Sequence, residues 1–240
     1  MAIKSIEYNQ HTFDLSYEML NPQASIDLIV LHGWGSNKNL MKMAFSPYMS
    51  GFRHIYIDLP GFGSSSCECA LYTKDYAEII ELFIGEIDAS KDIIIGHSFG
   101  GKVATLLKPK LLVLLGSAGI FIPKPFKVEL KIAIFKIFKL FGLARFRSLF
   151  VAKDAKSLSE DMYQTFKNVV DEEFSEEFAS YKGKALLCWG DSDTATPLGS
   201  AKKIAKLIDD STLKVYEGDH YFFMSKAKEV SKEIEEIYDI

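Results

Sequence analysis

The sequence has few of the features that mark secreted, membrane-spanning or metal-binding proteins. Only three of its 240 residues are cysteine, and they form neither a Cys-x-x-Cys pair nor another spacing typical of metal ligands. No apolar run approaches the roughly 20 residues of a membrane-spanning helix, and the first residues lack the apolar core of a signal peptide. We therefore expect a cytoplasmic protein with free thiols at Cys67, Cys69 and Cys188, no metal site and no stable membrane insertion.

An excess of charge of one sign is also missing. The formal net charge is −4 at pH 7, and 25% of the residues are charged against 48% that are hydrophobic. This balance gives no global basic footprint for nucleic acid and is ordinary for a globular protein. A chain of this length can bury one large core, so the composition favours a single α/β fold over several independent domains.

What the sequence does have is a regular alternation of short apolar strands and helical patterns. Residues 3–20 read as an N-terminal hairpin. Continuous apolar runs predict strands buried on both faces, and apolar residues at helical spacing predict the helices between them. The predicted strands are 27–31, 54–58, 93–95, 111–115, 185–189 and 212–216, with helices at 38–50, 73–88, 101–107, 198–208 and the C-terminus. Such alternation implies a parallel sheet covered on both faces.

Residues 93–101, which read IIIGHSFGG, give the clearest chemical signal. A strand runs directly into a Gly-x-Ser-x-Gly box, and a helix-compatible segment follows it. This context predicts a sharp strand-to-helix turn with Ser98 at its tip, in strained backbone geometry. Side chains two residues on either side of the serine would collide with nearby backbone, so glycine is needed there. We interpret Ser98 as a nucleophile.

A serine nucleophile needs a base, and histidine, which titrates nearest neutrality, is the usual one. Of the five histidines, His220 follows the last predicted strand, at the sheet edge where the serine turn also opens. His32 is expected to hold its own loop by hydrogen bonding, and His97 to pack or bond locally. His11 and His54 fit surface or structural roles. These positions favour His220 as the base.

The base needs a carboxylate that holds its tautomer and stabilises the imidazolium. Asp193 lies far enough out in its loop to reach across and is favoured, with Asp191 as the alternative. Asp219 adjoins the base in sequence, and such neighbours rarely meet. An oxyanion also needs hydrogen-bond donors fixed in advance. The backbone N–H groups of Phe99, directly after the nucleophile, and of Trp34, in a glycine-rich loop after a strand, are the candidates.

Taken together, these motifs resemble the α/β-hydrolase superfamily. The matching stretches read HGWG at 32–35, DLPGFGS at 58–64, GHSFGG at 96–101, WGDSD at 189–193 and GDH at 218–220. They occur in the family's order of nucleophile, acid and base. The resemblance implies an α/β-hydrolase fold, with a mostly parallel, doubly wound sheet and an inserted helical lid. It also implies a Ser98–Asp193–His220 triad that needs no metal or organic cofactor.

Within that superfamily the chain resembles small cytoplasmic carboxylesterases, including pimeloyl-carrier-protein methyl ester esterases. It also resembles the meta-cleavage hydrolases of 2-hydroxy-6-oxo-dienoates, which typically have Asn and Trp where this chain has His97 and Tyr221. We therefore predict hydrolysis of a small-molecule carboxylic ester, with a short or medium acyl group, through an acyl-enzyme. The alternatives are C–C bond hydrolysis of a dienoate and a non-catalytic binding protein on the same fold.

Residues 121–179 interrupt the alternation of strands and helices. They contain helical patterns and no convincing strand, and they follow a predicted strand directly. We expect them to form a helical lid over the carboxyl edge of the sheet, where ligands of open α/β folds bind. The hydrolase core would then comprise residues 1–120 and 180–240.

The predicted lid has two halves of opposite charge. Residues 124–147 contain seven basic residues and one acidic residue, whereas residues 154–177 contain eight acidic and two basic residues. The lysines at Lys131, Lys136 and Lys139 lie on a mostly apolar helical pattern. Three interpretations stay open for them: a solvated face, a docking patch for an acidic carrier protein or anionic substrate, and reversible contact with an anionic membrane surface.

Overall fold

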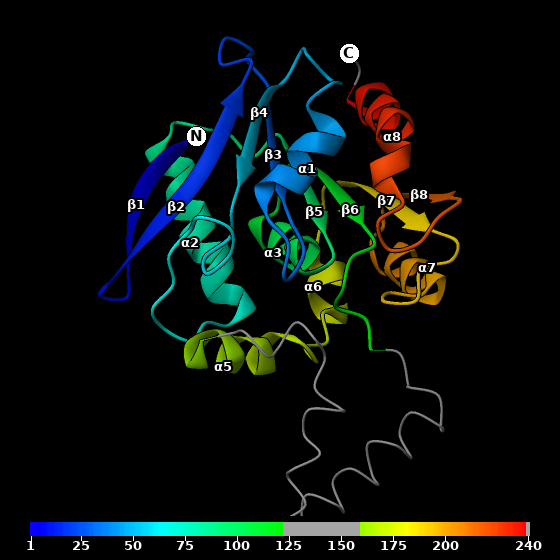
Figure 1. Ribbon diagram of the computed structural model, residues 1–240. Helices are drawn as coiled ribbons and strands as arrows, with labels where there is room; N and C mark the ends of the chain where they lie inside the picture. The colour runs from blue at the N-terminus through cyan, green and yellow to red at the C-terminus, as the bar shows by residue number, and fades with distance from the viewer. Residues whose placement is uncertain (122–158, 239–240) are drawn as a thin grey trace, which may run out of the picture.

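The computed structural model describes residues 1–121 and 159–238, which form an eight-stranded sheet with helices on both faces (Figure 1). The strands are β1 (Ala2–Tyr8), β2 (His11–Leu20), β3 (Asp27–Leu31), β4 (Arg53–Ile57), β5 (Ile93–His97), β6 (Leu111–Leu115), β7 (Lys184–Gly190) and β8 (Ser211–Tyr216). The helices are α1 (Lys38–Phe45), α2 (Thr73–Glu86), α3 (Phe99–Leu107), α5 (Glu160–Val169), α6 (Ser175–Ser180), α7 (Leu198–Leu207) and α8 (Phe223–Ile237). Among the described residues, none of the helices has the length and apolar character needed to cross a membrane.

The strand order is β1-β2-β4-β3-β5-β6-β7-β8. The predicted N-terminal hairpin is antiparallel, and β2 also pairs antiparallel with β4. All other neighbouring strands are parallel, which confirms the predicted fold class. β3 lies between β4 and β5. The chain therefore places its next strand, β4, on one side of β3 and the following strand, β5, on the other side. Ligands of open α/β sheets bind at the carboxyl ends of strands, at such a switch point.

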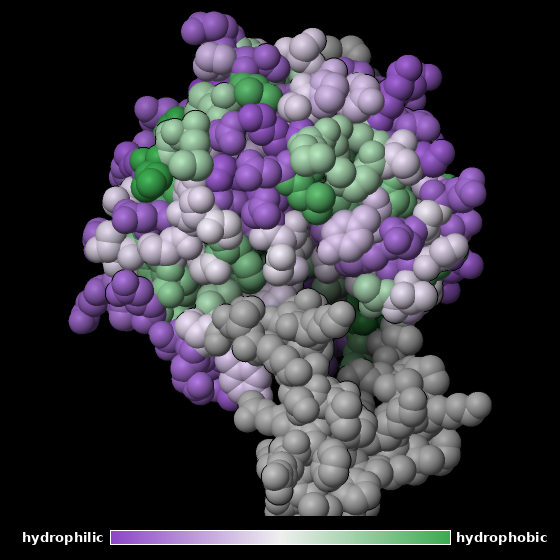
Figure 2. All heavy atoms as spheres, in the orientation of Figure 1, coloured by the Kyte–Doolittle hydropathy of each residue, from purple (hydrophilic) through white to green (hydrophobic). Residues whose placement is uncertain are grey.

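Side chains of the central strands alternate between two apolar layers. In β3, Ile29 and Leu31 pack in the layer under α2, α3 and α7, whereas Leu28 and Val30 pack in the layer under α1 and α8. All four are fully buried. The strand is apolar at every position because both of its faces are covered. On the face seen in Figure 2, hydrophilic residues separate small groups of exposed hydrophobic ones.

The ends of helices α1 and α3 can be compared with the sequence prediction. α1 begins where the Asn37 side chain accepts a hydrogen bond from the Asn39 backbone N–H (3.0 Å), and it ends at Phe45 rather than at residue 50. α3 ends early, as predicted, with Lys108 in the left-handed conformation at a φ of 51°. A residue in this conformation cannot continue a right-handed helix.

The segment predicted to form a lid is described in part. α5 and all of α6 except its last residue belong to it, and α5 lies across the lower end of the sheet in Figure 1. The predicted basic helix with Lys131, Lys136 and Lys139 lies outside the described residues. The division into a core and a lid stays a prediction for residues 122–158.

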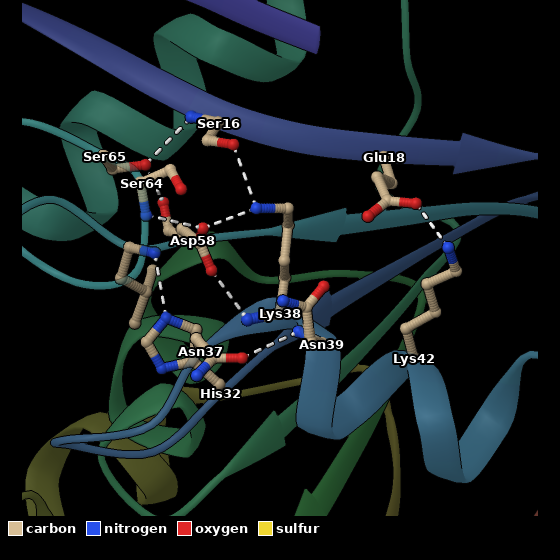
Figure 3. A network of polar contacts seen from close by, with 11 residues as sticks. Ser16, Glu18, His32, Asn37, Lys38, Asn39, Lys42, Asp58, Ser64 and Ser65 are labelled. Atoms are coloured by element: carbon tan, nitrogen blue, oxygen red, sulfur yellow. Dashed lines mark hydrogen bonds and ion pairs between the residues drawn. The ribbon is translucent and has the colours of Figure 1, made fainter. Parts of the chain in front are cut away.

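A buried ion pair joins the end of β4 to the start of α1 (Figure 3). Lys38 Nζ lies 2.6 Å from Asp58 Oδ2, and the two side chains are 2% and 1% exposed. The Asp58 carboxylate also accepts the backbone N–H groups of Lys38 (2.7 Å) and Ser64 (2.9 Å). The ammonium donates further to Ser16 Oγ of β2 at 2.9 Å. Buried charges are tolerated when they are paired and hydrogen-bonded in this way.

His32 connects the loop after β3 to the loop after β4. Its Nδ1 donates to the Gly33 carbonyl oxygen (2.8 Å), and its Nε2 accepts the Leu59 backbone N–H (3.0 Å). Burial lowers the pKa of His32 to about 4, so the ring is neutral and one nitrogen is free to accept. These contacts hold the glycine-rich loop, as the sequence predicted.

Replacing Lys38 with methionine would leave the Asp58 carboxylate buried without its cation. We expect the free energy of unfolding, measured by urea denaturation, to fall by about 3–5 kcal/mol. The matched control is Lys91→Met, which removes a pair with Glu81 between side chains that are 33% and 50% exposed. It should change stability little, because exposed pairs contribute little. Equal losses in both variants would contradict the importance of the buried pair.

Candidate active site

Ser98 lies at the turn between β5 and α3, with φ at 51° and ψ at −113°. A residue other than glycine rarely adopts this conformation, and strained backbone of this kind gathers at functional sites. The Ser98 N–H donates to the Leu115 carbonyl oxygen of β6 (3.1 Å). The Ser98 carbonyl oxygen accepts the N–H groups of Ala118 (3.1 Å) and Gly101 (3.0 Å). The backbone around the serine is therefore fixed, while the residue stays partly exposed.

Glycines let the turn pack against its neighbours. A Cβ on Gly96 would overlap the carbonyl group of Gly100, and a Cβ on Gly100 would lie 2.5 Å from the carbonyl oxygen of His32. Both contacts are with backbone, which has little freedom to move aside. α3 therefore lies directly against β5 and against the loop after β3, as expected from the Gly-x-Ser-x-Gly box.

His220 and Asp193 are brought together from the loops after β8 and β7. His220 Nδ1 lies 2.7 Å from Asp193 Oδ2, and the aspartate side chain is fully buried while the histidine is 15% exposed. Burial raises the pKa of Asp193, but hydrogen bonds from His220 and Thr196 outweigh it and hold that pKa below its usual range. The ionised carboxylate thus orients the ring, with Nδ1 as donor and Nε2 on the far side.

The other two aspartates considered for this place bond elsewhere. Asp191 Oδ1 accepts the Gly218 backbone N–H (3.1 Å), and this bond joins the loop after β7 to the loop after β8. Asp219 Oδ1 accepts the Tyr221 backbone N–H (2.8 Å). The geometry therefore places Asp193, and neither of these, against the imidazole.

Thr196 supports the aspartate and was not singled out from the sequence. Its backbone N–H and that of Ala195 each donate to Asp193 Oδ1 at 2.9 Å. Its hydroxyl lies 2.9 Å from Asp193 Oδ2 and 3.0 Å from the Gly116 carbonyl oxygen. An aspartate that accepts N–H groups two and three residues ahead is typical of an Asx turn. Residues 193–196, which read DTAT, are the local sequence pattern that could have indicated this turn.

β6 places the serine and the acid–base pair at the same edge of the sheet. Ser98 bonds to the last residue of β6, and a Cβ on the next residue, Gly116, would lie 3.2 Å from His220 Nδ1. Among the described residues the His220 ring bonds to Asp193 and Thr196, and not to the Ser98 hydroxyl. In free enzymes catalytic hydrogen bonds are often long and close only in the substrate complex.

His97 has a partner across the site rather than the local one that the sequence predicted. Its Nε2 donates to the His220 carbonyl oxygen (3.1 Å), and the two imidazole centroids are 4.6 Å apart. Burial and then the neighbouring His220 lower the pKa of His97 to about 3, so its ring is neutral. The bond forms because the end of β5 and the loop after β8 meet at this edge.

The loop after β3 packs directly on the serine turn. A Cβ on Gly33 would lie 2.8 Å from His97 Nδ1 and 3.2 Å from Ser98 Cβ. The backbone N–H groups of Trp34 and Phe99 donate to no other residue in the described part of the chain. Two unused donors beside a serine are the arrangement that an oxyanion requires.

A pocket of about 130 Å³ opens beside the serine. It is lined by Trp34, Ser98, Phe99, Lys102, Ala118, Phe166, Val169 and Val170. The Trp34 ring packs edge-on against Phe99, with centroids 5.6 Å apart, and at a tilt against Phe166 of α5, with centroids 5.4 Å apart. Among the described residues the lining is mostly apolar, and Lys102 is the one charged side chain in it. Lys102 and Phe166 were not foreseen, because no local pattern places them beside Ser98.

Known proteins resemble this chain in sequence and in fold. A family model described as the alpha/beta hydrolase family matches residues 28–233. The chain belongs to the alpha/beta hydrolase family. The hydrolase is 35% identical over 79 residues to the pimeloyl-[acyl-carrier protein] methyl ester esterase of Vibrio campbellii. The aligned stretch covers 33% of this chain and 30% of that esterase.

Solved structures resemble the hydrolase over nearly its whole length. The esterase EaEST from Exiguobacterium antarcticum has a TM-score of 0.75 at 20% identity, over 98% of this chain and 99% of that one. The meta-cleavage product hydrolase CumD from Pseudomonas fluorescens IP01 has a TM-score of 0.69 at 20% identity, over 98% and 97%. At this identity the likeness establishes the shared fold and does not identify a substrate.

An alanine at Gly96 tests the packing of the serine turn in the hydrolase. We expect it to lower the free energy of unfolding by about 1–3 kcal/mol, the usual effect of overpacking a core. The control is Gly199→Ala in the first turn of α7, where a Cβ would meet nothing within 4 Å. That change should be neutral or slightly stabilising. Thermal unfolding of both variants measures the difference, and an unchanged Gly96→Ala midpoint would contradict the described packing.

Proposed function

We propose that this hydrolase cleaves small carboxylic esters by acyl transfer to Ser98. His220 acts as the general base and acid, and Asp193 holds its orientation. The backbone N–H groups of Trp34 and Phe99 bind the oxyanion. In this proposal residues 121–179 form the lid of a core made of 1–120 and 180–240.

The observation that carries the proposal is the Asp193–His220 pair beside a strained, partly exposed serine. The 2.7 Å contact between the carboxylate and Nδ1 leaves the other ring nitrogen as the only one able to take a proton. An apolar pocket of about 130 Å³ opens beside the serine, and the backbone N–H groups of Trp34 and Phe99, two residues that line it, donate to no other described residue. Each part matches a requirement of acyl transfer: a base, an anion site and a place for the acyl group.

The first half of the proposed reaction forms the acyl-enzyme. Ser98 Oγ attacks the ester carbonyl carbon while its proton passes to His220 Nε2. The carbonyl oxygen becomes an oxyanion that accepts the Trp34 and Phe99 N–H groups. When the intermediate collapses, the C–O bond to the alcohol breaks and His220 returns the proton to the departing alcohol oxygen.

In the second half, water releases the acid. His220 takes a proton from a water molecule as the water oxygen attacks the acyl carbon, and the same backbone donors bind the second oxyanion. Collapse breaks the bond to Ser98 Oγ, which regains its proton from the imidazolium. The chain is restored and a carboxylic acid leaves, so no redox partner is needed to balance the reaction.

Substitution of the triad tests the mechanism. Ser98→Ala should reduce nitrophenyl butyrate turnover by at least about 10³-fold, and Asp193→Asn by roughly 10⁴-fold, the loss known for another Ser-His-Asp enzyme. The matched control is Asp191→Asn, two residues away, where an amide oxygen can still accept the Gly218 N–H. It should keep turnover within a few fold. Equal activity of the two Asp→Asn variants would rule out the proposed acid.

A substrate panel separates esters from the other reactions of this family. At about 130 Å³ the pocket is small, and its lining is mostly apolar. We therefore expect nitrophenyl butyrate to be cleaved faster than nitrophenyl octanoate, and both faster than a 2-hydroxy-6-oxo-dienoate. A strong preference for the dienoate would overturn ester hydrolysis. A fluorophosphonate that fails to label Ser98 would instead favour a non-catalytic protein.

We propose that an acidic carrier protein presents the acyl group and docks on the basic segment 124–147. The support is the partial match to a pimeloyl-[acyl-carrier protein] esterase together with seven basic residues against one acidic residue at 124–147. Reversing the charge at Lys131, Lys136 and Lys139 should raise KM for a carrier-linked ester and leave a small neutral ester unaffected. If both substrates keep their KM, this partner is wrong, and binding of the unaltered chain to anionic vesicles would point to a membrane surface instead.

A further inference from the structure

Lys102 is a buried cation with no part in the proposed reaction. It lies on α3, four residues after Ser98, and is 1% exposed. Its ammonium donates to the Val169 carbonyl oxygen (2.5 Å) and to Glu172 Oε2 (2.8 Å). Burial lowers the pKa of Lys102, and the Glu172 carboxylate opposes that shift. A lysine is almost never buried to this extent unless it is paired.

The partners of Lys102 lie at the end of α5. Val169 is the last residue of that helix, where carbonyl groups have no partner within the helix. The ammonium supplies the missing donor and a positive charge at the negative end of the helix. Thr73, at the start of α2, donates its hydroxyl to the same Glu172 carboxylate. The end of α5 is thus fixed to the two helices that flank the serine turn.

The same end of α5 forms a wall of the pocket. Phe166, Val169 and Val170 line it together with residues of the serine turn. The rings of Phe99 and Phe174 lie 5.6 Å and 5.0 Å from the Lys102 ammonium and keep its surroundings apolar. The position of this wall relative to Ser98 therefore depends on the contacts that Lys102 makes.

A second set of hydrogen bonds attaches α5 to the residues just before α2. Thr165 Oγ1 accepts the Leu71 backbone N–H (3.0 Å), and the Asn168 side-chain amide donates to the Leu71 carbonyl oxygen (3.2 Å). These bonds do not involve Lys102. Loss of the ammonium should therefore loosen the segment from Val169 to Glu172 at the pocket, while Thr165 and Asn168 keep the helix attached to the core.

We propose that Lys102 is a specificity-determining positioning residue of this hydrolase. By binding Val169 and Glu172 it holds the end of α5 close to α3 and so limits the length of acyl group that the pocket accepts. The inference rests on the proposed ester hydrolysis, of which it names a substrate determinant. Its charge is matched by Glu172, so it acts on the wall and is not a binding site for an anionic acyl end.

Lys102→Met, which keeps most of the side-chain length and removes the ammonium, tests this role. The measurement is kcat/KM for nitrophenyl acetate, butyrate, hexanoate and octanoate, with active sites counted by fluorophosphonate labelling. We expect the octanoate-to-butyrate ratio to rise at least tenfold, through a lower KM for octanoate. Lys167→Met removes an exposed lysine from the same helix and is the matched control, with an expected ratio equal to that of the unaltered chain.

A double variant guards against misfolding caused by an unpaired acid. Lys102→Met combined with Glu172→Met removes both charges and should give the same change of ratio. An unchanged ratio in both variants would overturn the proposal. A loss confined to a nitrophenyl ester with a terminal carboxylate would also overturn it, because Lys102 would then bind the substrate directly.

Amide hydrogen exchange tests the same contact without any substrate. Exchange in peptides covering 160–172 should become faster in Lys102→Met, while peptides covering 198–207 should stay as they are. If the unaltered chain cleaves no ester, the proposed function fails, yet the exchange result still decides whether Lys102 holds α5. Equal exchange in α5 with and without the ammonium would show that it does not.

Discussion

Direct contact between backbone segments around Ser98 is the constraint on which the site depends. Gly96 meets the first turn of α3, and Gly100 meets the carbonyl oxygen of His32. Because no side chain separates them, β5, α3 and the loop after β3 hold one another in place. The N–H groups of Trp34 and Phe99, which donate to no other described residue, are therefore positioned by the packing of the fold, without a need for a substrate to arrange them.

Three buried pairs of polar side chains near the carboxyl edge of the sheet are arranged in the same way. Lys38 with Asp58, Lys102 with the α5 segment, and His220 with Asp193 each join parts of the chain that are far apart in sequence. Every carboxylate in these pairs also accepts other hydrogen bonds. A charge that is satisfied on several sides resists displacement, so such pairs fix the relative positions of loops that would otherwise vary.

Features formed by residues close together in the sequence could be predicted from it, whereas contacts between distant residues could not. The strands were predictable because continuous apolar runs such as 111–115 appear only where both faces of a sheet are covered, and the serine turn because its glycines are neighbours in sequence. The contact of His97 with His220 spans 123 residues and that of Lys102 with Glu172 spans 70. No periodicity encodes such partners, so the pocket wall and the support of the base emerge only in three dimensions.

The strand order also has a consequence for biosynthesis. The proposed nucleophile leaves β5 in the middle of the sheet, whereas the proposed base follows β8 at its far edge. A nascent chain emerging from the ribosome would therefore display the serine long before its partner histidine exists. In the proposed mechanism a polypeptide that stops before β8 has the nucleophile and lacks the base, so the reaction becomes available only once β8 has paired with β7.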